Sequence, residues 1–311
     1  MKWILKAFLQ RTIGVLPAHE RINYFFQKKI TKNLPVTDVT FDEKIELAAQ
    51  RVDLFRRFSN GITVQKARFL EFGAGWDLIG PLAMSMLGVQ NQILLDITSH
   101  LRFELIMNAL DRLRKHSIRF KEITGQEPLL FSGIVENKND LLRLFGIDYR
   151  APLDAASTGF KSGSIDFIST NSTLEHIPAS ELRAIMQESF RILAPGGLMC
   201  HFIDLKDHYS YFDTSISKYH FLKFSKFWWS FYNSSLHYQN RLRLPEYQAL
   251  IAEAGFEILY EEIDSASEKE LSDLRLLNIH PDFKDRFSII ELSAQLYRVV
   301  ARKPLSSNVA S

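Results

Sequence analysis

The feature of this sequence that most constrains its fold is an alternation of strand-like and helix-like segments that begins near Lys66. Short apolar runs end in turn residues, and each is followed by a stretch whose apolar residues recur at helical spacing. Such alternation favours parallel strands joined by right-handed crossovers, with helices covering both faces of one sheet. In sheets of this kind, ligands bind beyond the carboxyl ends of the strands. The strand-like runs are ARFLEF, QILLDIT, SIDFIST and LMCHFID.

The composition is that of an ordinary globular protein: 311 residues, 46% of them hydrophobic and 24% charged. A formal net charge of +2 offers little attraction to nucleic acid, so we expect no nucleic-acid partner. The single cysteine, Cys200, excludes an intrachain disulfide and is typical of a reducing compartment. No apolar run approaches the roughly 18 residues needed to cross a bilayer. Together these features predict a cytoplasmic protein.

Residues 1–34 differ in character from the rest, with seven basic side chains and one acidic side chain. Within them, apolar side chains recur at roughly helical spacing, which predicts a basic amphipathic helix. Such a helix either lies at the surface of an anionic membrane or packs on its own domain or on a partner subunit. The apolar residues are Trp3, Ile4, Phe8, Leu9 and Ile13.

We expect three parts: a helical extension over residues 1–60, a main domain over 61–303 and a frayed tail over 304–311. Residues 204–243 interrupt the main domain with many aromatic side chains and three histidines. A segment of this length between a strand and a helix is more often functional than idle. This segment is the candidate acceptor-binding lid. Its aromatic side chains can equally form the core of a small helical subdomain, and the two interpretations are compatible.

A glycine-rich turn, Glu71 to Gly75, directly follows the first strand-like run. Glycines there let a ligand approach the backbone closely, because no Cβ intervenes. Dinucleotide-binding enzymes would place a third glycine three residues after Gly75, where this chain has Leu78. Asp96 ends the next strand about twenty residues later, where a carboxylate can accept hydrogen bonds from ribose hydroxyls. The turn and the acid together predict a nucleoside-containing cofactor.

Further segments follow in a recognisable order: the LDAA turn at Asp154, SIDFISTNSTLEHI, and RILAPGG before LMCHFID. EAGFEI then places a helix end before another strand. Over roughly residues 60–303 the chain therefore resembles the class I (Rossmann-like) S-adenosylmethionine-dependent methyltransferases. The resemblance implies an α/β fold with a doubly wound, mostly parallel seven-stranded sheet and an antiparallel strand near the C-terminus.

The same resemblance implies the cofactor, S-adenosylmethionine, and the residues that bind it. In the family the glycine turn holds the methionyl part, the acid at the end of the second strand binds the ribose, and the later turn meets the adenine. Two departures stand out: Asp77 replaces the usual third glycine, and the stretch between Asp96 and Asp154 is long. The implied cofactor residues are Glu71, Gly73, Ala74, Gly75, Asp96, Ile97, Asp154, Ala155 and Asn171.

Methyl transfer to a hydroxyl benefits from a general base, worth about 10²–10⁴-fold in rate. We predict His208 as the first candidate for this base and His176 as the second, although His176 could equally be structural. Asp207 is placed to orient the imidazole of His208 if the two neighbouring side chains converge. We expect no metal site, because one cysteine and scattered histidines show no ligand spacing.

These features predict methyl transfer to a small-molecule or saccharide (glycan-precursor) acceptor, at oxygen. Arg241 and Arg243 either pair with an anionic acceptor or cap the following helix. The alternatives are a noncatalytic ligand-binding or scaffold protein and a methyltransferase acting on protein or RNA. A nicotinamide enzyme is disfavoured, since no Tyr-x-x-x-Lys pair stands in a suitable helix. Peripheral membrane contact through residues 1–34 and a homodimer are left open.

Overall fold

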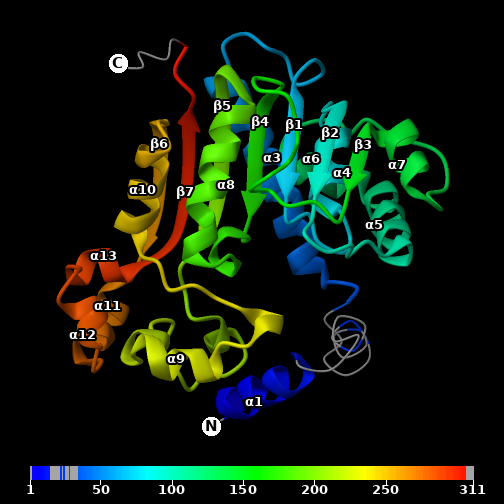
Figure 1. Ribbon diagram of the computed structural model, residues 1–311. Helices are drawn as coiled ribbons and strands as arrows, with labels where there is room; N and C mark the ends of the chain where they lie inside the picture. Colours follow the sequence, from blue (N-terminus) through cyan, green and yellow to red (C-terminus); the bar gives the residue numbers. More distant parts are fainter. Residues whose placement is uncertain (1, 15–21, 23, 25–27, 29–33, 306–311) are drawn as a thin grey trace.

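The computed structural model describes residues 2–14, 22, 24, 28 and 34–305 (Figure 1). The C-terminal half of the basic segment expected at residues 1–34 lies largely outside these described residues, as do residues 306–311 of the expected tail. None of the helices in the described ranges combines the length and apolarity that a bilayer crossing requires.

A seven-stranded sheet forms the centre of the molecule, with the strand order β3-β2-β1-β4-β5-β7-β6. The five strands β1 to β5 pair in parallel, whereas β7 runs antiparallel to both β5 and β6. This arrangement confirms the predicted fold class, including the antiparallel strand near the C-terminus. The strands are β1 (Arg68–Phe72), β2 (Asn91–Leu95), β3 (Ile147–Arg150), β4 (Ile165–Asn171), β5 (Leu193–Asp204), β6 (Glu257–Ser265) and β7 (Ala294–Arg302).

Helices cover both faces of the sheet, as Figure 1 shows. Because side chains alternate between the faces of a strand, Phe69 of β1 enters one core and Leu70 enters the other. Helices α3 (Asp38–Phe58), α4 (Ile79–Met86), α5 (Phe103–Lys115), α6 (Ser117–Thr124) and α7 (Lys138–Phe145) pack on the first face. Helices α8 (Ala179–Ile192) and α10 (Leu244–Glu253) pack on the second.

Helix α3 belongs to the core of the sheet although it precedes the first strand. Thr37 caps its N-terminus, since the Thr37 hydroxyl accepts a hydrogen bond from the Thr40 amide at 3.3 Å. Its buried side chains, among them Val52 and Phe55, pack in the same core as Phe69 of β1. Helix α3 therefore braces the strand that leads into the glycine turn.

The aromatic segment builds a third core with helices from both ends of the chain. Trp3 and Ala7 of α1 (Lys2–Gly14) are buried there against Tyr209, Phe221 and Trp229. The aromatics thus form a helical subdomain with its own core, and α1 packs on its own domain. Figure 1 places this layer beneath the carboxyl ends of the parallel strands. Its elements are η3 (His208–Tyr211), η4 (His220–Lys223), α9 (Lys226–Tyr232), η5 (Ser235–His237), α11 (Glu268–Leu276), α12 (Pro281–Lys284) and α13 (Ile289–Ser293).

Candidate functional site

A cleft of about 550 Å³ opens at the carboxyl ends of β1, β2 and β4. This is the position at which doubly wound sheets bind their ligands. Six of the nine residues predicted to bind the cofactor line it: Gly73, Gly75, Asp96, Ile97, Asp154 and Ala155. The sequence segments that carry them are far apart, and the parallel topology brings them to one edge.

The glycine turn after β1 needs both of its glycines, for different reasons. Gly73 and Gly75 have positive φ angles of 78° and 77°, a backbone conformation that residues with a side chain rarely adopt. A Cβ on Gly73 would lie 2.5 Å from the side chain of Thr173, so this glycine allows β1 and the turn after β4 to meet closely. A Cβ on Gly75 would meet no atom of the described residues within 4 Å. Gly75 therefore presents bare backbone to the open cleft, as a cofactor cradle requires.

The Asp96 side chain is buried, and its carboxylate has only part of its hydrogen-bonding capacity filled. The Tyr149 hydroxyl donates a hydrogen bond to Asp96 Oδ2 at 3.0 Å. Burial raises the pKa of the Asp96 carboxyl to about 7, against the opposing hydrogen bond from Tyr149. Hydroxyl donors of a ribose would favour the ionised form of such a carboxylate. The side chain therefore suits the ribose role that the family resemblance implies.

The Asp154 turn reaches the same cleft despite the long stretch that separates it from Asp96. The Leu153 amide donates to the Asp96 backbone carbonyl at 2.9 Å, which ties the turn to the end of β2. Asp154 Oδ1 accepts the Ala156 amide at 2.8 Å and shapes the turn. The intervening residues form α5, α6 and α7, away from the cleft, so they do not displace the expected adenine contact.

Three predicted cofactor residues, Glu71, Ala74 and Asn171, are not among the residues that line the cleft. Glu71 is buried and its Oε2 pairs with Arg51 Nη1 of α3 at 2.7 Å. Its carboxylate thus anchors the strand to α3, a role that sequence reasoning did not foresee. Asn171 ends β4 and offers its backbone carbonyl to the Thr173 hydroxyl at 3.1 Å.

Asp77, which replaces the family's third glycine, is committed to local structure. Its carboxylate pairs with Lys44 Nζ at 2.7 Å and accepts the Ile79 amide at 3.2 Å, at the start of α4. Trp76 and His100 line the cleft and stack with ring centroids 5.4 Å apart. Sequence analysis missed this pair, and the position of Trp76 next to Gly75 was the signal available.

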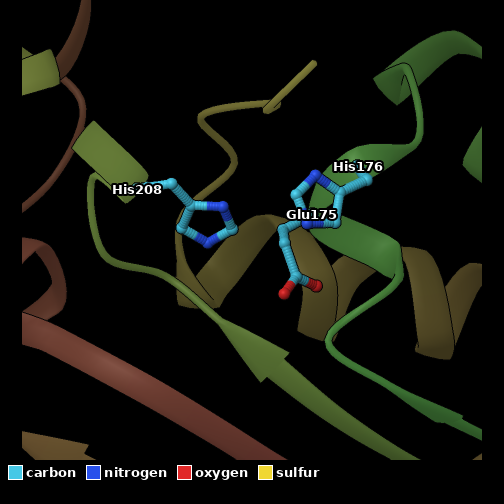
Figure 2. A group of neighbouring side chains, drawn as sticks. All are labelled: Glu175, His176 and His208. Carbon is cyan, nitrogen blue, oxygen red and sulfur yellow. The ribbon is translucent and has the colours of Figure 1, made fainter. Parts of the chain in front are cut away.

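The predicted catalytic histidines lie together, but the predicted carboxylate partner does not. The rings of His176 and His208 are 4.9 Å apart between centroids, and His176 lines the cleft (Figure 2). Asp207 accepts the Tyr209 amide at 2.8 Å and caps η3, so its carboxylate faces His220 at 3.5 Å instead of His208. The expected Asp207–His208 pairing is therefore not formed. Asp204 takes its place, 3.6 Å from His208 Nε2.

Glu175 completes this cluster, and sequence analysis did not single it out. It is only 1% exposed, and burial raises the pKa of its carboxyl well above the usual range. Burial also lowers the pKa of His176 to about 4, helped by the neighbouring His208, so this imidazole is neutral near pH 7. Donor atoms of Glu175, His176 and His208 lie within 4.8 Å of one another. This grouping differs from the expectation of no metal site, because the fold brings together ligands that the sequence separates.

Arg241 and Arg243 serve the helical subdomain. The fully buried Arg243 donates from Nη1 to the Leu205 carbonyl and from Nη2 to the Ala294 carbonyl, both at 2.7 Å. Arg241 donates to the Phe221 carbonyl at 2.9 Å. Both guanidinium groups are engaged with backbone carbonyls, which does not support pairing with an anionic acceptor. Arg243 instead occupies the N-cap of α10, where its amide donates to the Glu246 carboxylate at 2.9 Å, so the alternative of helix capping is confirmed for this residue.

Comparison with known families identifies the class. A family model described as a methyltransferase domain matches residues 41–261, which include the whole cleft. The chain belongs to this methyltransferase family. It is accordingly an S-adenosylmethionine-dependent methyltransferase, as the resemblance implied, and S-adenosylmethionine supplies an electrophilic methyl group on a sulfonium.

Solved structures with a similar fold differ strongly in sequence from this chain. The [4+2]-cyclase SpnF is 16% identical with a TM-score of 0.45, covering 85% of this chain and 81% of the other. A putative sarcosine dimethylglycine methyltransferase from Galdieria sulphuraria has the same identity and TM-score, and the match covers 85% of this chain and 86% of the other. Geranyl diphosphate methyltransferase in complex with SAM is 11% identical with a TM-score of 0.44, covering 84% and 85%. No curated protein sequence matches this chain.

Proposed function

We propose that the methyltransferase methylates a hydroxyl group of a small-molecule or saccharide acceptor by in-line displacement. The observation that carries the proposal is the buried cluster of Glu175, His176 and His208 at the edge of the cofactor cleft. A hydroxyl, unlike a thiol or amine, needs activation before it attacks, and such a cluster can provide it. The acceptor oxygen forms a bond to the methyl carbon, the carbon–sulfur electron pair stays on sulfur, and the hydroxyl proton passes to an imidazole nitrogen of the cluster.

The cleft supports a division of roles among the predicted cofactor residues. Gly73 and Gly75 cradle the methionyl part, Asp96 with Ile97 binds the ribose, and Asp154 with Ala155 borders the adenine. This order follows the strands along the sheet edge and leaves His176 at the other end of the cleft. The acceptor then approaches from the helical subdomain. Tyr211, which is 59% exposed and hydrogen-bonds Asp204, offers an aromatic face beside His208 for an acceptor ring.

Incubation of the purified protein with S-adenosylmethionine carrying a labelled methyl group tests this function. The acceptors offered are hydroxyl-bearing small molecules, nucleotide sugars and lipid-linked saccharides, with protein and RNA as alternatives. Mass spectrometry is expected to find the label on an oxygen of a small molecule or saccharide. Label on protein or RNA alone would contradict the proposal. Cofactor binding without transfer to any acceptor would favour a noncatalytic role.

The helical subdomain also supports peripheral contact with an anionic membrane. Helix α1 buries Trp3 and Ala7 but leaves its other apolar side chains in solvent next to exposed aromatics of α9. Lys6 and Arg11 lie over aromatic rings of this surface, so positive charge accompanies the apolar area. Apolar and basic groups together are typical of helices at membrane surfaces. The exposed side chains are Ile4, Leu5, Phe8, Leu9, Phe212, Phe227, Trp228 and Phe231.

Replacement of Phe8 by glutamate is expected to reduce binding to anionic vesicles roughly tenfold, because burying a phenylalanine contributes about 1.5–3 kcal/mol. Co-sedimentation with phosphatidylcholine vesicles containing phosphatidylglycerol measures the effect. Ile118→Glu is the matched control, since Ile118 of α6 is 76% exposed and lies outside this surface. Equal sedimentation of the Phe8 variant and the unmodified protein would argue against membrane contact here.

A further inference from the structure

Three side chains of metal-binding types converge from two separate loops at the carboxyl end of the sheet. Glu175 and His176 belong to the 3₁₀ turn η2 (Leu174–His176) after β4, and His208 opens η3 after β5. Their donor atoms all lie within 4.8 Å of one another. Figure 2 shows the three side chains next to one another, with the Glu175 carboxylate below the two imidazole rings in this view. Two imidazoles and one carboxylate form a common ligand set for divalent transition metals.

Buried polar atoms in this cluster lack partners within the described part of the chain. Glu175 Oε2 and His208 Nε2 are both inaccessible to solvent and accept or donate no hydrogen bond there. Glu175 Oε1 has only the Asp204 amide, at 3.4 Å. A buried polar group without a partner is costly, and a bound cation would satisfy the carboxylate and imidazole lone pairs together.

The outer contacts of the cluster orient the imidazoles as ligands. His176 Nδ1 lies 2.7 Å from the Tyr238 carbonyl, so this nitrogen carries the proton and Nε2 keeps its lone pair. Asp204 stands 3.6 Å from His208 Nε2, with Lys206 Nζ 3.8 Å from the Asp204 carboxylate. A carbonyl group behind a histidine, as Tyr238 provides for His176, is a usual outer-shell contact of a metal ligand. The Asp204 carboxylate instead lies beside the same His208 nitrogen that an ion would use, and its negative charge favours a cation there.

One short stretch, Tyr238 to Asn240, holds both loops in place. The Asn240 side chain donates to the carbonyls of Leu174 and Ile177, each at 2.8 Å, and so clamps η2. Gln239 accepts the His208 amide at 3.2 Å and thereby holds η3. The two loops that carry the three side chains are therefore fixed by a common frame, as preorganised binding sites require.

We propose that Glu175, His176 and His208 bind one divalent transition-metal ion, which holds the acceptor hydroxyl beside the cofactor cleft. Imidazole ligands favour zinc, iron, cobalt or nickel over magnesium and calcium. His176 lines the cleft, so an ion bound to it stands next to the cofactor. The role toward the acceptor rests on the proposed function, whereas binding of the ion does not.

Such an ion would act on the acceptor as a Lewis acid. Three protein ligands leave at least one coordination position for an outside oxygen. A hydroxyl in that position loses its proton to water more readily, which raises its nucleophilicity near neutral pH. Its oxygen then bonds to the methyl carbon while the carbon–sulfur pair returns to sulfur. The two histidines thereby serve hydroxyl activation as ligands, in place of the direct base role predicted from sequence.

Titration of the chelator-treated full-length protein with Co²⁺ tests the site by visible absorption and calorimetry. We expect one equivalent to bind, with ligand-field bands of a site containing nitrogen and oxygen ligands. His208→Ala and Glu175→Gln should each weaken binding more than about 100-fold, since the loss of an outer-shell partner alone costs about 10- to 100-fold. His220→Ala is the control, because His220 belongs to the same segment and is similarly buried, 9% against 8% exposed. Binding of S-adenosylhomocysteine reports whether each variant remains folded.

The outcomes separate the metal site from the function. Absence of stoichiometric Co²⁺ binding by the unmodified protein, or equal binding by a folded His208→Ala variant, overturns the site. If Co²⁺ binds but labelled methyl transfer is unchanged by chelator, the ion has no role toward the acceptor and the histidines act without it. If no acceptor is methylated, the titration still decides whether the ion binds. Zn²⁺ competing with Co²⁺ for one site supports the proposal.

Discussion

Replacement of Gly75 by alanine is expected to weaken binding of S-adenosylhomocysteine by at least about 30-fold while the protein remains folded. Within the part of the chain that the structure describes, the added Cβ meets no atom within 4 Å, so it points into the space that the cofactor would fill. The positive φ of 77° adds backbone strain of about 1–2 kcal/mol for a residue with a side chain. Calorimetric titration measures the affinity, and circular dichroism confirms the fold.

The variant Gly125→Ala separates the effect of backbone strain at positive φ from the effect of filling cofactor space. Gly125 follows the last residue of α6 with a φ of 68° and lies outside the cleft. Its added Cβ would also meet nothing within 4 Å among the described residues. This variant should show similar destabilisation and unchanged cofactor affinity. Equal affinity in the Gly75 and Gly125 variants would show that the turn does not contact the cofactor.

Replacement of Arg51 by methionine is expected to lower the free energy of unfolding by about 3–5 kcal/mol, because it removes the ion-pair partner that the described residues provide for the buried Glu71 carboxylate. The side chains of Arg51 and Glu71 are 2% and 6% exposed, and their ion pair joins α3 to the end of β1. Urea denaturation followed by circular dichroism measures the change.

Two further variants make the test specific. Asp53→Asn removes an exposed ion pair with Arg56 on the same helix and should cost at most about 1 kcal/mol. A double variant, Arg51→Met with Glu71→Leu, should recover much of the loss, since an apolar pair carries no buried charge. A single Arg51 variant as stable as the unmodified protein would contradict the anchoring role of Glu71.

The fold could be predicted because its signals are local. Strand-like runs alternate with helical patterns, and β1, β2, β4 and β5 lie where those runs occur. The strand β3 (Ile147–Arg150) was not predicted, because its four residues include two charged side chains and it stands at the edge of the sheet. An edge strand needs no continuous apolar run, so its pattern is weak.

The cofactor side of the site was predictable for the same reason. Gly75, Asp96 and Asp154 each follow a strand or a turn, and parallel strands bring their carboxyl ends to one edge. Glu71 was assigned to the cofactor, but whether its carboxylate faced the cleft depended on Arg51, which lies twenty positions earlier on a helix. No local pattern reveals such a partner.

The catalytic side depends on tertiary contacts that sequence spacing does not encode. Asp207 was expected to orient His208, yet it caps η3 and turns toward His220, because its carboxylate accepts the Tyr209 amide. Glu175 meets His208 only because the turns after β4 and β5 converge. Side chains that follow neighbouring parallel strands can be expected to lie close together once the strand order is known. That order came from the structure.

A crystal structure of the protein with S-adenosylhomocysteine tests the central claim most directly. We expect the ribose hydroxyls within hydrogen-bond distance of Asp96, the adenine beside Asp154 and Ala155, and the sulfur facing His176. A ligand bound elsewhere, or an Asp96 side chain turned away from the ribose, would contradict the assignment of this cleft as the cofactor site.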